Sequence, residues 1–385
     1  MSEYQYYEFQ ALDRPLTRAQ MDELRAHSSR ARITPTSFVN EYNWGSFKGD
    51  PVKWIEKYFD AFLYVANWGS RWFMLRVPKR LLDPKIVSQY CAGESFSFHT
   101  KGEHIILSFN SEDEVGEWED GEGWLASLTA LRSELMHGEY RCLYLGWLLA
   151  LQACELDSDT IEPPVPSGLG ELSAPLRGLE EFLRIDSDLI AAAAECSNER
   201  SAPTLSRTDI AGWVAKLPSQ EKDKVIAALL QSGDLHVGDE LRQRALREIR
   251  GGAQCGHDSK ENERRRVMQL VERAESIAKD RRQRETEKRS RENAKREREQ
   301  AEKRKKHLKS LIGKENALWS KIDVLIATKQ PKRYDEAVSL LRDLHDVAMM
   351  TGQQCAFSSR METLCREQAR KPSLLDRFRK ANLIG

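Results

Sequence analysis

The pair Glu134 and His137 has the most recognisable metal-ligand spacing in the chain. On a helix, Glu-x-x-His places both side chains on one face, and two such sequences with two further glutamates form a di-iron site. No second Glu-x-x-His occurs. Because half of this arrangement cannot hold two irons, we expect no metal centre here.

Two further groups could bind a metal ion but have simpler interpretations. Cys255 and His257 flank a glycine, and we favour an exposed linker over a reactive thiol or a metal site. His99 and His104 lie on either side of a turn with Glu103, and a polar turn is the commoner arrangement. No phosphate-binding loop, GxGxxG, HExxH or GxSxG sequence is present. We assign no catalytic, cofactor or metal-binding residue, and an enzyme assembled from residues far apart in the sequence stays a second alternative.

Basic residues form the other candidate site, because lysine and arginine can neutralise the phosphates of a nucleic acid. One group surrounds Trp72, whose ring could stack on a base, although a core role is commoner for aromatics in a small domain. The other group lies within a long charged stretch. Glutamates interspersed there weaken the positive electrostatic potential and favour the simpler interpretation of a solvated spacer. The candidate nucleic-acid-binding residues are Arg71, Arg76, Lys79, Arg80, Arg264, Arg265, Arg266, Arg281, Arg282, Lys303, Arg304, Lys305 and Lys306.

The charged stretch, residues 258–312, is predicted to be one long helix. It contains no interior glycine or proline, and several glutamates precede a lysine or arginine by four residues. A lone solvated helix is favoured. A weak coiled coil through Ala294, Ala301 and Leu308 stays open, as does disorder. Apolar residues at helical spacing within residues 267–278 predict that its first turns pack on something.

Composition limits the class of protein. Formal net charge is zero, with 60 basic and 60 acidic residues, and the acidic run within residues 112–122 is expected to be a solvated loop. Seven cysteines without CxxC spacing indicate a reducing compartment. The beginning of the chain lacks the pattern of a secretory signal, and the longest apolar run, residues 142–151, is too short to cross a bilayer. We expect a cytoplasmic protein without a membrane contact.

Strand and helix patterns alternate through the first 110 residues and predict an α+β domain. Residues 4–12, 32–44 and 72–77 are expected to be extended, and residues 96–99 and 104–109 to form a hairpin. Asp50 is predicted to cap a helix that begins at Pro51 and continues through the aromatic residues as far as Leu63.

The middle of the chain is predicted to be helical. Residues 124–153 are interpreted as two helices, with Cys142 and Cys154 as inert core thiols. After a proline- and glycine-containing boundary, five short helices follow, and Ser219 is predicted to cap one of them. The expected helices are residues 176–185, 187–196, 208–217, 219–231 and 238–249.

Residues 313–385 are predicted to form a helical cap with one tetratricopeptide-like helix pair. The motifs that carry a family resemblance here are Trp319, Tyr334-Asp335-Glu336-Ala337, Leu340-Leu341-Arg342-Asp343-Leu344 and Lys371-Pro372-Ser373-Leu374-Leu375-Asp376-Arg377. This stretch resembles the C-terminal helical region of bacterial SWIM zinc-finger proteins. The family's Cys-x-Cys and Cys-x-His zinc motif is absent, so no zinc ligand is carried over. The resemblance implies an association with nucleic-acid-related systems.

The sequence thus predicts an α+β N-terminal domain (1–123), an irregular helical domain (124–250), a long charged helix (258–312) and a helical cap (313–385), predominantly α overall. The expected function is that of a non-enzymatic interaction or adaptor protein. It would hold another protein through its head and through residues 313–385, across the charged helix. The alternative is a nucleic-acid-associated protein that binds the phosphate backbone through the basic helix.

Overall fold

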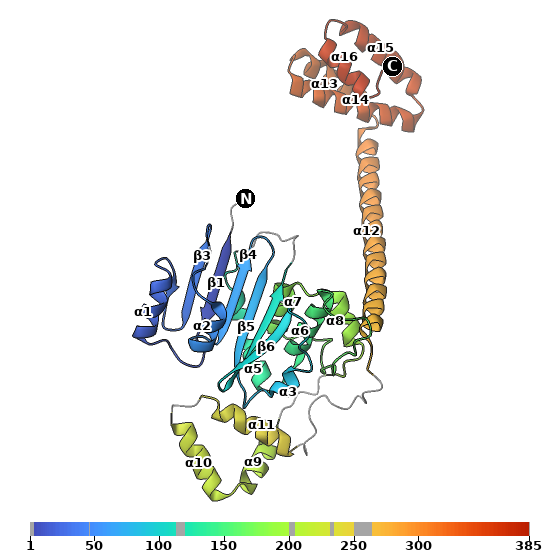
Figure 1. Ribbon diagram of the computed structural model, residues 1–385. Coiled ribbons are helices and arrows are strands. Elements are labelled where there is room, and N and C mark those ends of the chain that lie inside the picture. Colours follow the sequence, from blue (N-terminus) through green and yellow to red (C-terminus); the bar gives the residue numbers. More distant parts are fainter. Residues whose placement is uncertain are drawn as a thin grey trace. The chain divides into compact units, whose positions relative to one another are not determined.

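The N-terminal part of the chain is built on one antiparallel sheet. A computed structural model describes residues 4–45, 47–112, 120–199, 205–231, 235–249 and 264–384. The seven strands of the sheet have the order β2-β3-β1-β4-β5-β7-β6, so the first strand of the chain, β1, lies inside the sheet and not at its edge (Figure 1). The strands are β1 (Gln5–Gln10), β2 (Arg32–Ile33), β3 (Ser37–Tyr42), β4 (Ala61–Ala66), β5 (Arg71–Pro78), β6 (Phe96–Lys101) and β7 (His104–Ser111).

Both faces of this sheet are apolar, because its strands carry apolar residues at successive positions and successive side chains point to opposite sides. Along β4, Phe62 belongs to one core, whereas Leu63 and Val65 belong to another. The first core is aromatic and lies under α1 (Arg18–His27) and α2 (Pro51–Lys57), with Phe9 opposite Phe62 in the β1–β4 register. The hairpin of β6 and β7 is confirmed, as are the extended segments before it.

The helix predicted from Pro51 to Leu63 is too long. Asp50 does cap it, and its side chain accepts a hydrogen bond from the Lys53 amide. The helix ends at Lys57, however, and Phe62 and Leu63 belong to β4. A run of aromatic residues suits a helix or a strand, and pairing of β4 with both β1 and β5 decides for the strand.

Helices cover the other face of the sheet and share one core with it. Residues 124–153 hold three helices rather than the predicted two, because the helical pattern breaks at Thr129. The helix α6 is buried along nearly its whole length and packs so closely that a Cβ on Gly146 would lie 2.6 Å from the Phe96 ring. The helices are α3 (Pro84–Val87), α4 (Trp124–Leu128), α5 (Ala130–Met136), α6 (Arg141–Gln152), α7 (Ala174–Leu183) and α8 (Ser187–Ala194).

The predicted boundary near residue 123 therefore falls inside one core, which joins strand residues such as Phe73 to helix residues such as Leu148. Cys142 is buried as predicted. Cys154 is not a core thiol: it follows the end of α6, has a positive φ of 59° and is exposed.

Three further helices follow: α9 (Arg207–Lys216), α10 (Ser219–Leu230) and α11 (Val237–Ile249). All three were predicted within two residues of their bounds. The predicted cap is wrong in detail, because Ser219 is the first residue of α10 and Pro218 precedes it without a side-chain cap. The linker with Cys255 and His257 lies outside the described residues, as does most of the acidic run at 112–122.

The charged stretch is helical, as predicted, but α12 runs from Val267 to Leu311 and its predicted start at residue 258 is wrong. Residues 264–266 are not helical, because Arg266 pairs with Ile161 in an isolated β-bridge. Val267, Leu270 and Ala274 are buried in the core of the N-terminal part, which confirms that the first turns pack. Every described residue from 281 to 307 is exposed, including Ala294 and Ala301.

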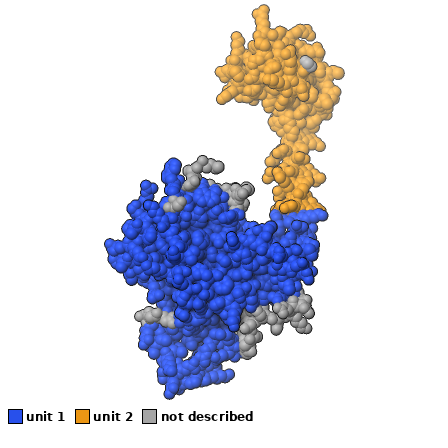
Figure 2. Space-filling view, viewed as in Figure 1, with its two compact units in different colours: residues 1–281 blue, residues 282–385 orange. Residues whose placement is uncertain are grey.

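The chain divides into two compact units, residues 1–281 (unit 1) and residues 282–385 (unit 2), coloured separately in Figure 2. Unit 2 has its own core, formed by α13 (Glu315–Ala327), α14 (Pro331–Thr351), α15 (Gln354–Glu367) and α16 (Pro372–Lys380). The structure is 57% helical and 13% strand, so it is predominantly α with an antiparallel N-terminal sheet, as the sequence predicts. In the part of the chain that the structure describes, no helix is long and apolar enough to span a membrane.

Candidate functional site

The basic residues near Trp72 mostly form contacts inside unit 1. Arg71 is buried and donates hydrogen bonds to the carbonyls of Glu181 (3.3 Å) and Phe182 (2.6 Å). Arg76 binds the buried Asp60 through Nε and Nη2, at 3.0 and 2.7 Å. Trp72 itself is half-buried. These two arginines therefore hold the fold together instead of presenting a free basic surface.

The two remaining basic residues of this region lie nearer the surface. Arg80 pairs with Glu240 of α11, with Nε 2.8 Å from the carboxylate. The Lys79 amide donates to the Glu103 carbonyl, and its side chain is half-buried. The structure therefore places the four predicted residues beside one another along β5 and its end, but in different environments.

The run Arg264 to Arg266 is similarly divided. Arg265 forms two hydrogen bonds with the carboxylate of Glu162, at 2.8 and 2.9 Å, and Glu162 is 2% exposed. The Tyr144 hydroxyl donates to the same carboxylate, and burial followed by the charge of Glu162 raises the Tyr144 pKa well above its usual value. Arg266 pairs with Asp159 at the surface, whereas Arg264 is half-buried. Arg265 is thus a structural residue.

In unit 2, Arg304 forms ion pairs with Asp343 and Asp346 of α14, the second at 2.7 Å. His307 Nε2 lies 2.9 Å from the other oxygen of Asp343. These contacts hold the last turns of α12 on α14. The other predicted basic residues of this unit are exposed: Arg282, Lys303, Lys305 and Lys306. Arg281, at the end of unit 1, pairs with the buried Asp188 at 2.7 Å.

The boundary between the units also divides charge. Residues 282–385 contain 26 lysines and arginines against 15 aspartates and glutamates, a net charge of +11. Residues 1–281 contain 34 against 45, a net charge of −11. The zero net charge of the whole chain therefore conceals two strongly and oppositely charged units.

The histidines considered as metal ligands have other partners. Glu134 accepts a hydrogen bond from Ser173, whereas His137 lies 3.0 Å from Asp239. His99 contacts Glu56 at 3.2 Å. Among the described residues, no group of three or more His, Cys, Asp or Glu side chains could hold a metal ion.

A network of buried charges joins α5 and α11 to the sheet. Arg132 of α5 binds both carboxylate oxygens of Asp13, at 2.8 and 2.6 Å. His236 Nε2 lies 3.1 Å from Asp13, and its Nδ1 lies 3.4 Å from Asp239, which also contacts His137. Burial alone would raise the pKa of Asp13, but hydrogen bonds and charges from Arg132 and His236 hold that pKa below its usual value.

His104 lies near this network on β7. Burial lowers its pKa, and the positive charge of Arg76 adds to the effect. The members of the network are far apart in the sequence, so no local spacing could have revealed them. They hold one another, and their role in the described structure is to attach α11 to the body of unit 1.

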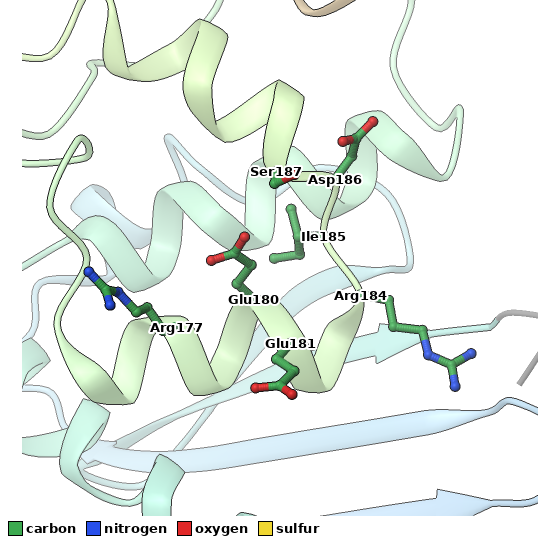
Figure 3. Close-up of a pocket in the computed structure, with 7 residues that line it drawn as sticks. All are labelled: Arg177, Glu180, Glu181, Arg184, Ile185, Asp186 and Ser187. Atoms are coloured by element: carbon green, nitrogen blue, oxygen red, sulfur yellow. The ribbon is translucent and has the colours of Figure 1, made fainter. Parts of the chain in front are cut away.

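A shallow, charged pocket of about 550 Å³ lies where α7 ends (Figure 3). Arg184, which closes that helix in a left-handed conformation, points away from Glu180 in this view. Burial raises the pKa of Glu180, Arg177 lowers it and Glu181 adds to the rise. The acidic and basic side chains do not converge on one point, so the pocket offers no arrangement for acid–base chemistry.

Comparisons with protein-family models, curated proteins and solved structures found no match to this chain. The similarity of the C-terminal helices to SWIM zinc-finger proteins therefore stays a prediction.

Proposed function

We propose that this chain is a non-enzymatic interaction protein whose unit 2, residues 282–385, binds an acidic surface of a protein partner. The observation that carries the proposal is the net charge of +11 on a unit with its own core. Such a charge accelerates encounters with an acidic partner and disfavours basic ones.

The distribution of charge supports a protein partner over a bare phosphate backbone. Six glutamates are interspersed with thirteen basic residues in residues 282–309, which gives a mixed pattern on an exposed helix. Arg304 is already paired with two aspartates. A partner with its own mixed charges can match such a surface more specifically than a uniform polyanion.

The proposal is tested with tagged full-length chain in cell extract, treated with nuclease, at low and at high salt. Replacing Lys303, Lys305 and Lys306 with glutamate should remove a specific protein from the purified complex. The matched control replaces the exposed Lys48, Lys85 and Lys101 of unit 1 with glutamate and should leave the complex intact. The proposal is wrong if no partner survives nuclease treatment, or if both triple variants bind it equally.

A second candidate is binding of nucleic acid, which the exposed side chains of Arg282, Lys303, Lys305 and Lys306 favour. The affinity of the full-length chain for a labelled DNA duplex would then fall steeply with salt, by a log–log slope of about 0.9 for each phosphate contacted. The Lys303, Lys305 and Lys306 triple variant would flatten that slope. A chain that binds neither duplex nor single strand at low salt would exclude this candidate.

A further inference from the structure

The three helices α9, α10 and α11 bury few of their apolar side chains. Among their described residues only Trp213 and Ala245 are buried apolar side chains. Ile210, Val214 and Ile226, by contrast, are 43%, 40% and 55% exposed. Contiguous exposed patches of large aliphatic side chains are typical of interaction sites. The three helices form the sides of a triangle in Figure 1.

An apolar groove of about 650 Å³ lies between these helices. It is lined by the apolar residues of all three, including Leu229, which is 54% exposed. Among the described residues that line the groove, only Lys222 and Arg242 are charged. An occupant must therefore be apolar on one side and acidic where it meets these two cations.

The groove does not face the body of unit 1. On α11, Gln243 donates to the carbonyls of Leu81 (2.8 Å) and Met136 (2.5 Å), and Asp239 contacts His137. Residues 241, 242 and 245, which line the groove, lie on the other side of that helix. One face of α11 is therefore attached to the protein while the other is available.

Polar contacts keep the three helices together although their core is small. Arg244 of α11 binds Glu221 of α10 and Glu248, and its guanidinium lies 5.9 Å from the Trp213 ring of α9. Trp213 Nε1 also donates to Glu248, at 2.7 Å. The groove is thus held in a defined form before any occupant arrives, which lowers the entropic cost of binding.

We propose that this groove binds an amphipathic helix of a partner protein, with apolar residues at helical spacing and carboxylates beside them. A helix satisfies its own backbone hydrogen bonds and needs cover on one side only, which suits an open groove. Its apolar side chains would complete the core of α9–α11, and its carboxylates would pair with Lys222 and Arg242. This site is independent of the binding proposed for unit 2.

The test is a selection from a displayed library of amphipathic helices with randomised flanking residues, using the full-length chain as the target. Selected helices should carry aspartate or glutamate at the flanks and apolar residues at i, i+3, i+4 and i+7. Their affinity, measured by fluorescence anisotropy, should fall about tenfold or more for Ile226→Asp. The matched control is Leu230→Asp, because Leu230 is 81% exposed but does not line the groove. The affinity of this variant for the selected helices should change less than about twofold.

Exchange of both cations, Lys222→Glu with Arg242→Glu, provides a second variant that leaves the apolar lining intact. This variant should bind helices with acidic flanks more weakly than the natural chain does, and helices with lysine flanks more strongly. The proposal is overturned if selection enriches no helix, or if Ile226→Asp and Leu230→Asp behave alike. It is overturned equally if the groove binds only a fatty acid such as dodecanoate, or if Ile226→Asp dissociates a dimer of the chain, since a second copy would then be the occupant.

Discussion

The neighbouring residues Arg265 and Arg266 should differ sharply in their contribution to stability. Arg265 is 17% exposed and binds Glu162, which is 2% exposed, with two hydrogen bonds. Arg265→Ala would leave that carboxylate buried without a countercharge. Arg266 is 57% exposed, and its partner Asp159 is 78% exposed, so water can replace the ion pair in Arg266→Ala.

The expected magnitudes follow from burial. Breaking a buried ion pair costs about 3–5 kcal/mol, whereas an exposed pair contributes about 0–1 kcal/mol. For a unit of this size each kcal/mol corresponds to about 2–4 °C in the unfolding midpoint. Arg265→Ala should therefore lower the midpoint by roughly 6–20 °C, and Arg266→Ala by no more than about 4 °C. Tryptophan fluorescence follows unit 1, because Trp319 is the only tryptophan of unit 2.

A double variant separates the lost charge balance from lost packing. Arg265→Met with Glu162→Gln removes both charges and retains most of the volume, so it should recover part of the midpoint lost in Arg265→Ala. Equal effects of Arg265→Ala and Arg266→Ala would refute the argument that burial decides. A double variant less stable than Arg265→Ala would refute the argument that an unpaired carboxylate is the cause.

Two further predictions concern packing and pH. Gly146→Ala should lower the free energy of unfolding, measured by urea titration, by about 1–3 kcal/mol, because its Cβ would meet Phe96 at 2.6 Å. Gly212→Ala in α9 should raise that free energy by up to about 1 kcal/mol, because its Cβ would meet no described atom within 4 Å apart from its chain neighbours and the backbone of its own helix. The pKa of His104 is lowered in the folded protein, so the unfolded chain binds more protons and stability falls as pH drops below about 6.5. Unfolding free energies at pH 7.5 and pH 5 should differ less in His104→Gln than in the natural chain, and an equal difference in both would contradict this.

Elements with strong local patterns could be predicted from the sequence. Asp50 and Pro51 mark the start of α2 through a side-chain cap and a fixed backbone angle, which depend on neighbouring residues only. The charged helix was also predictable, because residues 282–303 are exposed and are favoured as a helix by charged pairs four residues apart. Its apolar first turns correctly indicated packing in the core.

Features that depend on distant contacts could not be predicted in the same way. Nothing local distinguishes Arg265 from Arg266, yet one is buried against Glu162 and the other lies at the surface. Phe62 continues an aromatic pattern with helical spacing, but it lies in strand β4 of the sheet. The groove of α9–α11 was missed because its apolar residues look like the core of an ordinary helical domain, and only their exposed fractions show that it is open.

The pairing of Ile161 with Arg266, supported by hydrogen bonds from the Glu162 amide to the Arg265 carbonyl and from the Val267 amide to the Thr160 carbonyl, closes a ring of about one hundred residues. A single protease cut between residues 161 and 266 would not separate the two fragments, because the pairing of Ile161 with Arg266 and the neighbouring hydrogen bonds hold them together. Nicked protein should therefore migrate as one species on a sizing column and as two fragments in a denaturing gel.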